Sequence, residues 1–414
     1  MIDHYVHQAE ADCKQLHNKI GKIVEMNQKR VLEAFKRNRV SDSHFNTTTG
    51  YGYDDYGRET LESVYADVFG GEDALVRPQI VSGTHAISTA LFGLLRPNDE
   101  LLYITGKPYD TLESVIGKRG HNTGSLMDFG IGYNEAELLP DGSINYRLVQ
   151  KLITEKTKVI GIQRSKGYDD RPSFSISEIE KVISFIRKIN KDLIIFVDNC
   201  YGEFVEKKEP LHVGADIIAG SLIKNPGGGI VRAGGYIVGR KDLVSKCAHR
   251  LTAPGLGKET GATLHMLTEM YQGFFLAPHV VGEALKGAVF TARLLELAGL
   301  KTTPHYQEKR TDLIQSVIFE NAEQMITFCQ TIQQNSPINS FVTPYPSEMP
   351  GYEDEVIMAA GTFIQGASLE LTADGPIREP FTAFVQGGLT YEHVKIALQE
   401  SINNLVENGY LNIK

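Results

Sequence analysis

The feature that most constrains the fold of this chain is an unbroken apolar run at residues 193–197, followed directly by Asp198. Five consecutive apolar residues, three of them β-branched, predict a strand buried on both faces, as in the parallel sheets of α/β proteins. Ligands bind at the carboxyl ends of strands in open sheets of this kind. Asp198 is therefore expected at the edge of a binding site, although an aspartate that only caps a loop would give the same pattern.

Apolar segments alternate with amphipathic stretches from about residue 73 to 240, which predicts βαβ units and a mainly parallel sheet. The clearest helix is expected over Ile176–Ile189, where apolar side chains recur on one face. Beyond about residue 290 the pattern indicates an α+β arrangement that ends in a helix over Tyr391–Glu407. The strands expected before it lie at residues 101–104, 159–162, 193–197, 217–218 and 236–238.

These patterns divide the 414 residues into three parts. We expect a helical arm and an interface loop in residues 1–60, a large α/β domain in residues 61–290 and a small α+β domain in residues 291–414. The loop is rich in tyrosine and glycine and contains Tyr56 and Arg58. Such a loop indicates either an oligomer contact or a ligand contact.

Lys224 lies 26 positions (224 minus 198) after Asp198 and is followed by a stretch with three successive glycines. Pyridoxal phosphate (PLP) chemistry needs this pair: an amine that condenses with the cofactor aldehyde, and a buried carboxylate that keeps the pyridine nitrogen protonated. A solvated turn is the simpler interpretation of a lysine beside glycines. Ser221 and Lys224 also match the Ser-x-x-Lys of penicillin-recognising acyl transferases, but the chain has no Lys-Thr-Gly and no Ser-Asp-Asn.

A phosphate site is predicted at Ser82-Gly83-Thr84, which follows a strand expected to end at Ile80-Val81 and opens a helix. Backbone N–H groups at a helix start bind anions, and glycine permits their close approach. An ordinary capped helix start would look the same. Tyr109 is expected to stack on the cofactor ring, unless it is a surface residue, and Ser221 could add a hydroxyl to the phosphate site.

Composition and charge favour a protein that acts on small molecules. The formal net charge of -9 and the lack of a basic stripe argue against a nucleic-acid partner. No His spacing resembles a metal site, and the four dispersed cysteines suit reduced thiols. Because neither an apolar leader nor a membrane-spanning run is evident, we expect a cytoplasmic protein without a membrane partner.

In chain order, these segments resemble the fold-type I PLP enzymes of cysteine and methionine metabolism, which include cystathionine lyases and methionine gamma-lyase. More narrowly, the chain resembles the bacterial branch of aluminium-resistance or methionine gamma-lyase family proteins. The matching segments are Tyr56-Gly57-Arg58, Ser82-Gly83-Thr84, Tyr109, residues 163–168, residues 197–201, and Ser221 to Lys224 with the glycines that follow.

The resemblance implies a PLP-dependent transferase type I fold, with a mainly parallel large domain and a smaller C-terminal α+β domain. It also implies a homodimer or homotetramer with shared active sites, in which Tyr56 and Arg58 reach the phosphate of a neighbouring subunit. Lys224, Asp198 and Tyr56 would be the catalytic residues, with either Lys224 or Tyr56 removing the Cα proton.

Some positions depart from the family pattern. Ile223 replaces a threonine, Gln163 replaces an asparagine, and the cysteine that gamma-lyases carry after the stacking tyrosine is missing. The usual C-terminal Arg-Leu-Ser is not evident, so Arg378 is expected to bind the substrate carboxylate instead, although a surface arginine would fit the same pattern.

The expected reaction is β- or γ-elimination from a sulfur-containing amino acid such as cystathionine, cysteine or methionine. Two alternatives remain open at this point. One is another fold-type I reaction, such as transamination, aldol cleavage or replacement. The other is a stress-tolerance protein that keeps the fold without turnover.

Overall fold

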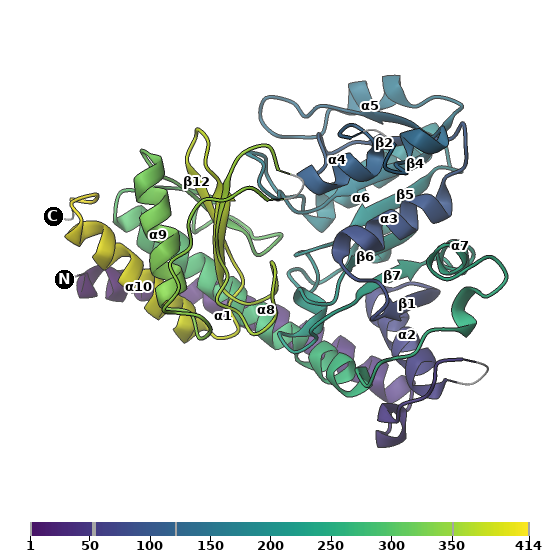
Figure 1. The fold of residues 1–414 in the computed structure, drawn as a ribbon, viewed down its shortest axis with the longest axis horizontal. Coiled ribbons are helices and arrows are strands. Elements are labelled where there is room, and N and C mark those ends of the chain that lie inside the picture. The colour runs from purple at the N-terminus through teal and green to yellow at the C-terminus, as the bar shows by residue number, and fades with distance from the viewer. Residues whose placement is uncertain (1, 52–54, 121, 350–351, 413–414) are drawn as a thin grey trace.

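The larger of two sheets forms the part of the molecule that carries Asp198 (Figure 1). The computed structural model describes residues 2–51, 55–120, 122–349 and 352–412; Gly52, Tyr53 and Asp54 of the predicted interface loop lie outside them. Strand β7 is antiparallel to both its neighbours, and the next five strands are mutually parallel, so the expectation of a mainly parallel sheet is confirmed. The sheet order is β1 (Asp73–Arg77), β7 (Gly235–Gly239), β6 (Ile217–Ser221), β5 (Ile194–Asp198), β4 (Thr157–Gln163), β2 (Glu100–Tyr103) and β3 (Gly132–Glu135).

Every residue of β5 is buried, because helices cover both faces of the sheet. Ile195 and Val197 pack into the same apolar cluster as α6 (Ile176–Ile189), whereas Ile194 and Phe196 pack with α3 (Gly83–Leu94) and α7 (Lys241–Leu251). Alternate side chains of a strand point to opposite faces, so burial on both faces explains the unbroken apolar run.

Two helix predictions were accurate, and one strand end was wrong. Helix α6 has the expected bounds, and its N-terminus is fixed by a capping box between Ser175 and Glu178. The strand expected to end at Ile80-Val81 ends at Arg77 instead. The next residue is Pro78, which has no N–H to donate to the ladder. The predicted C-terminal helix is also found, as α10 (Tyr391–Glu407).

The second sheet is antiparallel throughout and is packed against α9 (Ala322–Gln334) and α10. Its order is β10 (Val356–Ala359), β11 (Thr372–Pro376), β12 (Thr382–Gln386), β9 (Gln315–Ile318) and β8 (Lys301–Thr303). This is the smaller α+β part that the sequence predicts. Among the described residues, no helix is both long enough and apolar enough to cross a membrane.

Two long helices connect the regions around the two sheets. Helix α8 (Leu267–Leu297) and helix α1 (Asp3–Arg37) lie side by side along the base of the molecule, beneath both sheets (Figure 1). The predicted domain boundary at residue 290 falls inside α8. The division at residues 60 and 290 therefore stays a prediction.

The glycine-rich turn after Lys224 packs directly on α8. A Cβ added to Gly273 of α8 would collide with the carbonyl oxygen of Gly227, and one added to Gly228 would collide with the carbonyl oxygen of Gly273. Gly228 also has a φ of 57°, in the left-handed region that side chains disfavour. These backbones can approach closely only because positions 228 and 273 are both glycine, and the contact fixes the turn that carries Lys224.

We predict that Gly273→Ala lowers the free energy of unfolding by about 1–3 kcal/mol, because the added methyl group forces the turn away from α8. Gly21→Ala is the matched control: Gly21 lies exposed in α1, and its Cβ would meet nothing within 4 Å. That control is expected to be neutral or to stabilise by about 0.5–1 kcal/mol. Urea unfolding followed by circular dichroism measures both, and an unchanged midpoint for Gly273→Ala would contradict this account of the packing.

Candidate active site

A pocket of about 380 Å³ lies at the carboxyl ends of the parallel strands, with one wall from the smaller sheet. The strand ends contribute residues of β4, β5 and β6, and the start of α3 closes one side. The structure brings these predicted residues together along its lining: Ser82, Gly83, Thr84, Tyr109, Asp198, Ser221, Lys224 and Arg378.

Asp198 is the last residue of β5, and its side chain is 5% exposed. Its Oδ1 accepts a hydrogen bond of 3.1 Å from the backbone N–H of Cys200. Burial raises the pKa of this carboxyl, while the hydrogen bond and the charges of Lys224 and Arg171 act in the opposite direction. Such a carboxylate is stabilised by a cation placed against it in the pocket.

Lys224 reaches the pocket from the turn after β6. Its Nζ donates to Tyr201 Oη (2.7 Å) and to the carbonyl oxygen of Ala367 (3.0 Å), and it lies 3.9 Å from the centroid of the Tyr201 ring. Burial lowers the pKa of Lys224, but Tyr201, Cys200 and Asp198 outweigh it and the net direction is upward. The amine is thus held in one position beside the acid.

Tyr201 was not predicted as a site residue, although the segment that ends at it was noted for its family resemblance. It has a φ of 66°, which is uncommon for a residue with a side chain. Strained backbone of this kind persists where the surrounding structure enforces it, often at functional sites. Here the conformation accompanies the placement of the Tyr201 ring beside the Lys224 amine.

The start of α3 and Tyr109 form the opposite wall. Ser82 caps the helix by accepting from the backbone N–H of His85 (3.0 Å). Tyr109 Oη donates to Thr84 Oγ1 (2.9 Å), and its backbone N–H donates to Gln163 Oε1 (2.8 Å). A Cβ on Gly83 would lie 3.3 Å from both Cys200 Sγ and Ser221 Cβ, so the glycine lets the helix start approach the end of β6.

Lys166 is a second buried cation in the pocket, and the sequence assigned it no role. Its side chain is 3% exposed, and its Nζ donates to Ser316 Oγ (3.0 Å) on β9. Burial lowers the pKa of Lys166. Arg378 also lines the pocket, but it is about half exposed and pairs with Asp354 (2.9 Å). Of these two cations, Lys166 is the less solvated and has no carboxylate partner among the described side chains.

On the side of the pocket that the smaller sheet forms, a buried acid, Asp374 on β11, accepts hydrogen bonds from two lining residues. Tyr168 Oη donates to its Oδ2, and Gln386 Nε2 donates to its Oδ1 (3.4 Å). Both donors line the pocket. Burial raises the pKa of Asp374 to about 8, so the carboxyl is largely neutral at pH 7.

Tyr56 and Arg58 do not line this pocket. Tyr56 is 71% exposed at the start of α2 (Tyr56–Phe69). Arg58 is 1% exposed within its own chain, where Nη1 donates to the carbonyl oxygens of Gly50 (3.1 Å) and Gly261 (3.0 Å). Their expected contact with a neighbouring subunit stays a prediction.

The lining fits PLP. The start of α3 offers backbone N–H groups and hydroxyls for a phosphate, Tyr109 is an aromatic at the pocket wall, and Asp198 is a buried acid matched to a protonated ring nitrogen. Lys224 supplies the amine. Among the residues that the structure describes, no cluster of three or more His, Cys, Asp or Glu side chains could hold a metal ion.

Comparisons with known proteins agree with this geometry. The sequence model of the methionine gamma-lyase family matches residues 2–406. The uncharacterized protein YnbB of Bacillus subtilis is 64% identical over 401 residues, covering 97% of this chain and 95% of that protein. The crystal structure of a Listeria innocua protein, provisionally described as a cystathionine beta-lyase involved in aluminium resistance, has a TM-score of 0.96 and 62% identity, with 98% of this chain and 99% of that chain covered. The PLP-dependent protein YhfS of Escherichia coli shares the fold, with a TM-score of 0.61 at 18% identity over 93% of this chain and 97% of that one.

Proposed function

The chain belongs to the methionine gamma-lyase family, and from that premise we propose that it is a PLP-dependent carbon–sulfur lyase. Its substrate would be a sulfur-containing amino acid of the cystathionine, cysteine or methionine type, cleaved by β- or γ-elimination. The observation that supports this most directly is that Asp198, Lys224 and the start of α3 line one pocket.

When bound there, PLP supplies an aldehyde that reacts with amines and a pyridine ring that accepts electrons. The start of α3, with Ser82, Thr84 and Ser221, would hold its phosphate. Tyr109 would lie against the ring, and the Asp198 carboxylate would keep the ring nitrogen protonated.

Lys224 would carry out the proton transfer. Its Nζ would accept the substrate's Cα proton, because it is the amine already inside the pocket, with Tyr56 of a neighbouring subunit as the alternative base. Tyr201 would orient Nζ through the hydrogen bond and ring contact described above. The leaving thiolate needs a proton to depart as a thiol, which the same lysine can return.

The substrate carboxylate needs a cation in the pocket wall. We propose Lys166 for this contact, in addition to the predicted Arg378. A buried ammonium whose one hydrogen-bond acceptor among the described residues is a hydroxyl gains more from an incoming carboxylate than an exposed guanidinium that already has a carboxylate partner.

The purified protein is expected to be yellow, with PLP attached to Lys224. Borohydride reduction followed by peptide mapping tests this, and a label on another lysine would exclude the proposal.

Asp198→Asn should retain PLP but lose about a hundredfold or more in turnover, because a neutral amide stabilises the protonated ring nitrogen less. Ammonia, keto-acid and thiol assays on a panel of sulfur amino acids measure turnover and separate elimination from transamination, aldol cleavage or replacement.

Lys166→Met is expected to raise KM by about tenfold or more, because a charged hydrogen bond to the substrate is lost. The PLP spectrum should stay unchanged. Arg378→Met is the matched comparison and should have a smaller effect. If Arg378→Met raises KM and Lys166→Met does not, Arg378 is the carboxylate contact.

The shared site can be tested without disturbing the buried Arg58. Because Tyr56 is exposed, Tyr56→Phe should fold normally. If Tyr56→Phe alone loses turnover, mixing its subunits with inactive Lys224→Ala subunits should restore up to about one quarter of wild-type activity, since that fraction of randomly assembled sites combines two intact residues. Subunit exchange seen by mass spectrometry without recovered activity would mean that Tyr56 serves its own chain, and full turnover of Tyr56→Phe alone would mean that Tyr56 does not act in catalysis.

A further inference from the structure

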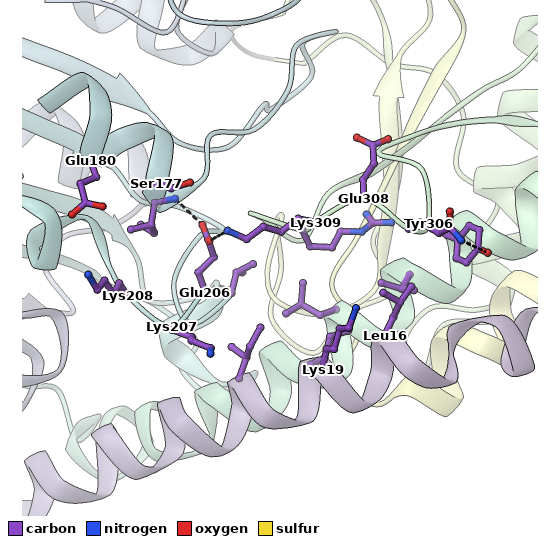
Figure 2. Close-up of a pocket in the computed structure, with 18 residues that line it drawn as sticks. Leu16, Lys19, Ser177, Glu180, Glu206, Lys207, Lys208, Tyr306, Glu308 and Lys309 are labelled. Carbon is purple, nitrogen blue, oxygen red and sulfur yellow. Dashed lines mark hydrogen bonds and ion pairs between the residues drawn. The ribbon is translucent and has the colours of Figure 1, made fainter. Parts of the chain in front are cut away.

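A second cavity, of about 560 Å³, lies between α1, α6 and α8, away from the PLP pocket lining (Figure 2). A connecting segment before β9 forms its far wall. Figure 2 shows Lys19 pointing into the cavity from α1, and Lys309 reaching across it to Glu206. The volume is within the range of roughly 300–1,000 Å³ that is usual for small-molecule sites.

The lining divides into an apolar part and a cationic part. The apolar part comes from the facing sides of the three helices and from Val205, and the cations come from α1, the loop after Val205 and the connecting segment. The apolar residues are Leu16, Ile20, Ile23, Ile176, Val205, Leu285 and Val289, and the cations are Lys19, Lys207, Lys208, Lys309 and Arg310.

Arg310 is the least solvated of these cations. Its side chain is more than nine-tenths buried, and one nitrogen, Nη2, donates to the carbonyl oxygen of Ala288 (3.3 Å) and to Gln315. Its Nε and Nη1 are buried and have no hydrogen-bond partner among the described residues. These two donors point to different sides of the guanidinium and expose almost no surface, so Arg310 adds positive charge to the cavity wall without offering a direct contact to a ligand.

The lining contains three carboxylates, Glu180, Glu206 and Glu308, against the five cations. Glu206 is already used: it pairs with Lys309 and with the buried Arg164 (3.4 Å), and it accepts from the backbone N–H of Ile176 (2.8 Å). Within the part of the chain that the structure describes, Lys19 and Lys207 form no ion pair. The cavity therefore presents positive charge above an apolar floor.

One chain segment contributes to the lining of both the cavity and the PLP pocket. The segment from Tyr306 to Ile314 lines the cavity through Lys309 and Arg310 and the pocket through Ile314. Asp312, on the same segment, accepts a hydrogen bond of 2.7 Å from Ser165, which also lines the pocket. A ligand that packs against Tyr306 or Lys309 would act on this segment directly.

We propose that this cavity binds a small amphipathic carboxylate, with its apolar chain against the floor and its carboxylate at Lys19 and Lys207. Occupancy changes the neighbouring pocket through the segment from Tyr306 to Ile314. The binding site is independent of the proposed lyase activity, whereas its effect on turnover rests on that proposal.

Octanoate is the probe, with octanol and octylamine of the same chain length as controls. Calorimetric titration of the PLP-loaded protein should give one octanoate site per chain with a Kd below about 1 mM, and binding at least about tenfold weaker for octanol and octylamine. Equal binding of the three would overturn the carboxylate assignment, and no octanoate binding would overturn the site.

Variants locate the site. Lys19→Gln combined with Lys207→Gln should weaken octanoate binding about tenfold, because both side chains are exposed at the cavity and their loss does not threaten the fold. Lys22→Gln, exposed on α1 outside the cavity lining, should leave binding unchanged. Leu16→Trp should fill the floor and abolish binding. If none of the three cavity substitutions changes the affinity for octanoate, octanoate binds elsewhere and the proposal is overturned.

The coupling has its own test. Saturating octanoate should change kcat/KM for the sulfur amino acid by at least about threefold in the wild type but not in Leu16→Trp. If octanoate binds without changing kcat/KM, the proposed effect on turnover is overturned, but the proposed binding site stands. If calorimetry shows binding but no sulfur amino acid is turned over, the proposed function fails and the cavity assignment stands.

Discussion

The burial of the Asp198 carboxylate determines how the rest of the pocket is arranged. An ionised acid in so enclosed a position is stable only when charges and hydrogen bonds compensate for the lost water. Lys224 and Arg171 provide those charges from two directions, one from the turn after β6 and the other from the loop after β4. Arg171 is itself held by the carbonyl oxygens of Pro172 (2.9 Å) and Ser165 (2.6 Å).

The residues that sequence reasoning found are those whose local context reveals their position. Asp198 ends an apolar run and Ser82 begins a helix, and both features are visible within a few residues. Parallel strands then bring such positions to the same edge of the sheet, so their meeting follows from the fold class. The position of Lys224 depends on more: its turn is set by glycine contacts with α8, which no local pattern indicates.

The contacts that sequence reasoning missed join residues far apart in the chain. Lys166 contacts Ser316, 150 residues later, and Lys224 bonds to the carbonyl oxygen of Ala367, 143 residues later. Arg310 is a charged residue in a polar segment, so the sequence predicts that it is exposed to solvent, but tertiary packing buries it. Arg58 presents the same difficulty, because a polar loop gave no sign that its guanidinium would be enclosed by Gly50 and Gly261.

The long helix α8 also limits how the pocket can move. Its 31 residues span roughly 46 Å as a single helix, packed along α1 for much of that length. In many two-domain enzymes the domains rotate about a short linker, but here the paired helices α1 and α8 extend under both sheets. A large opening of the pocket would require these two helices to bend. Changes in the shape of the pocket are therefore left to short segments at its rim, so what the pocket can hold depends on side chains there more than on closure of one half against the other.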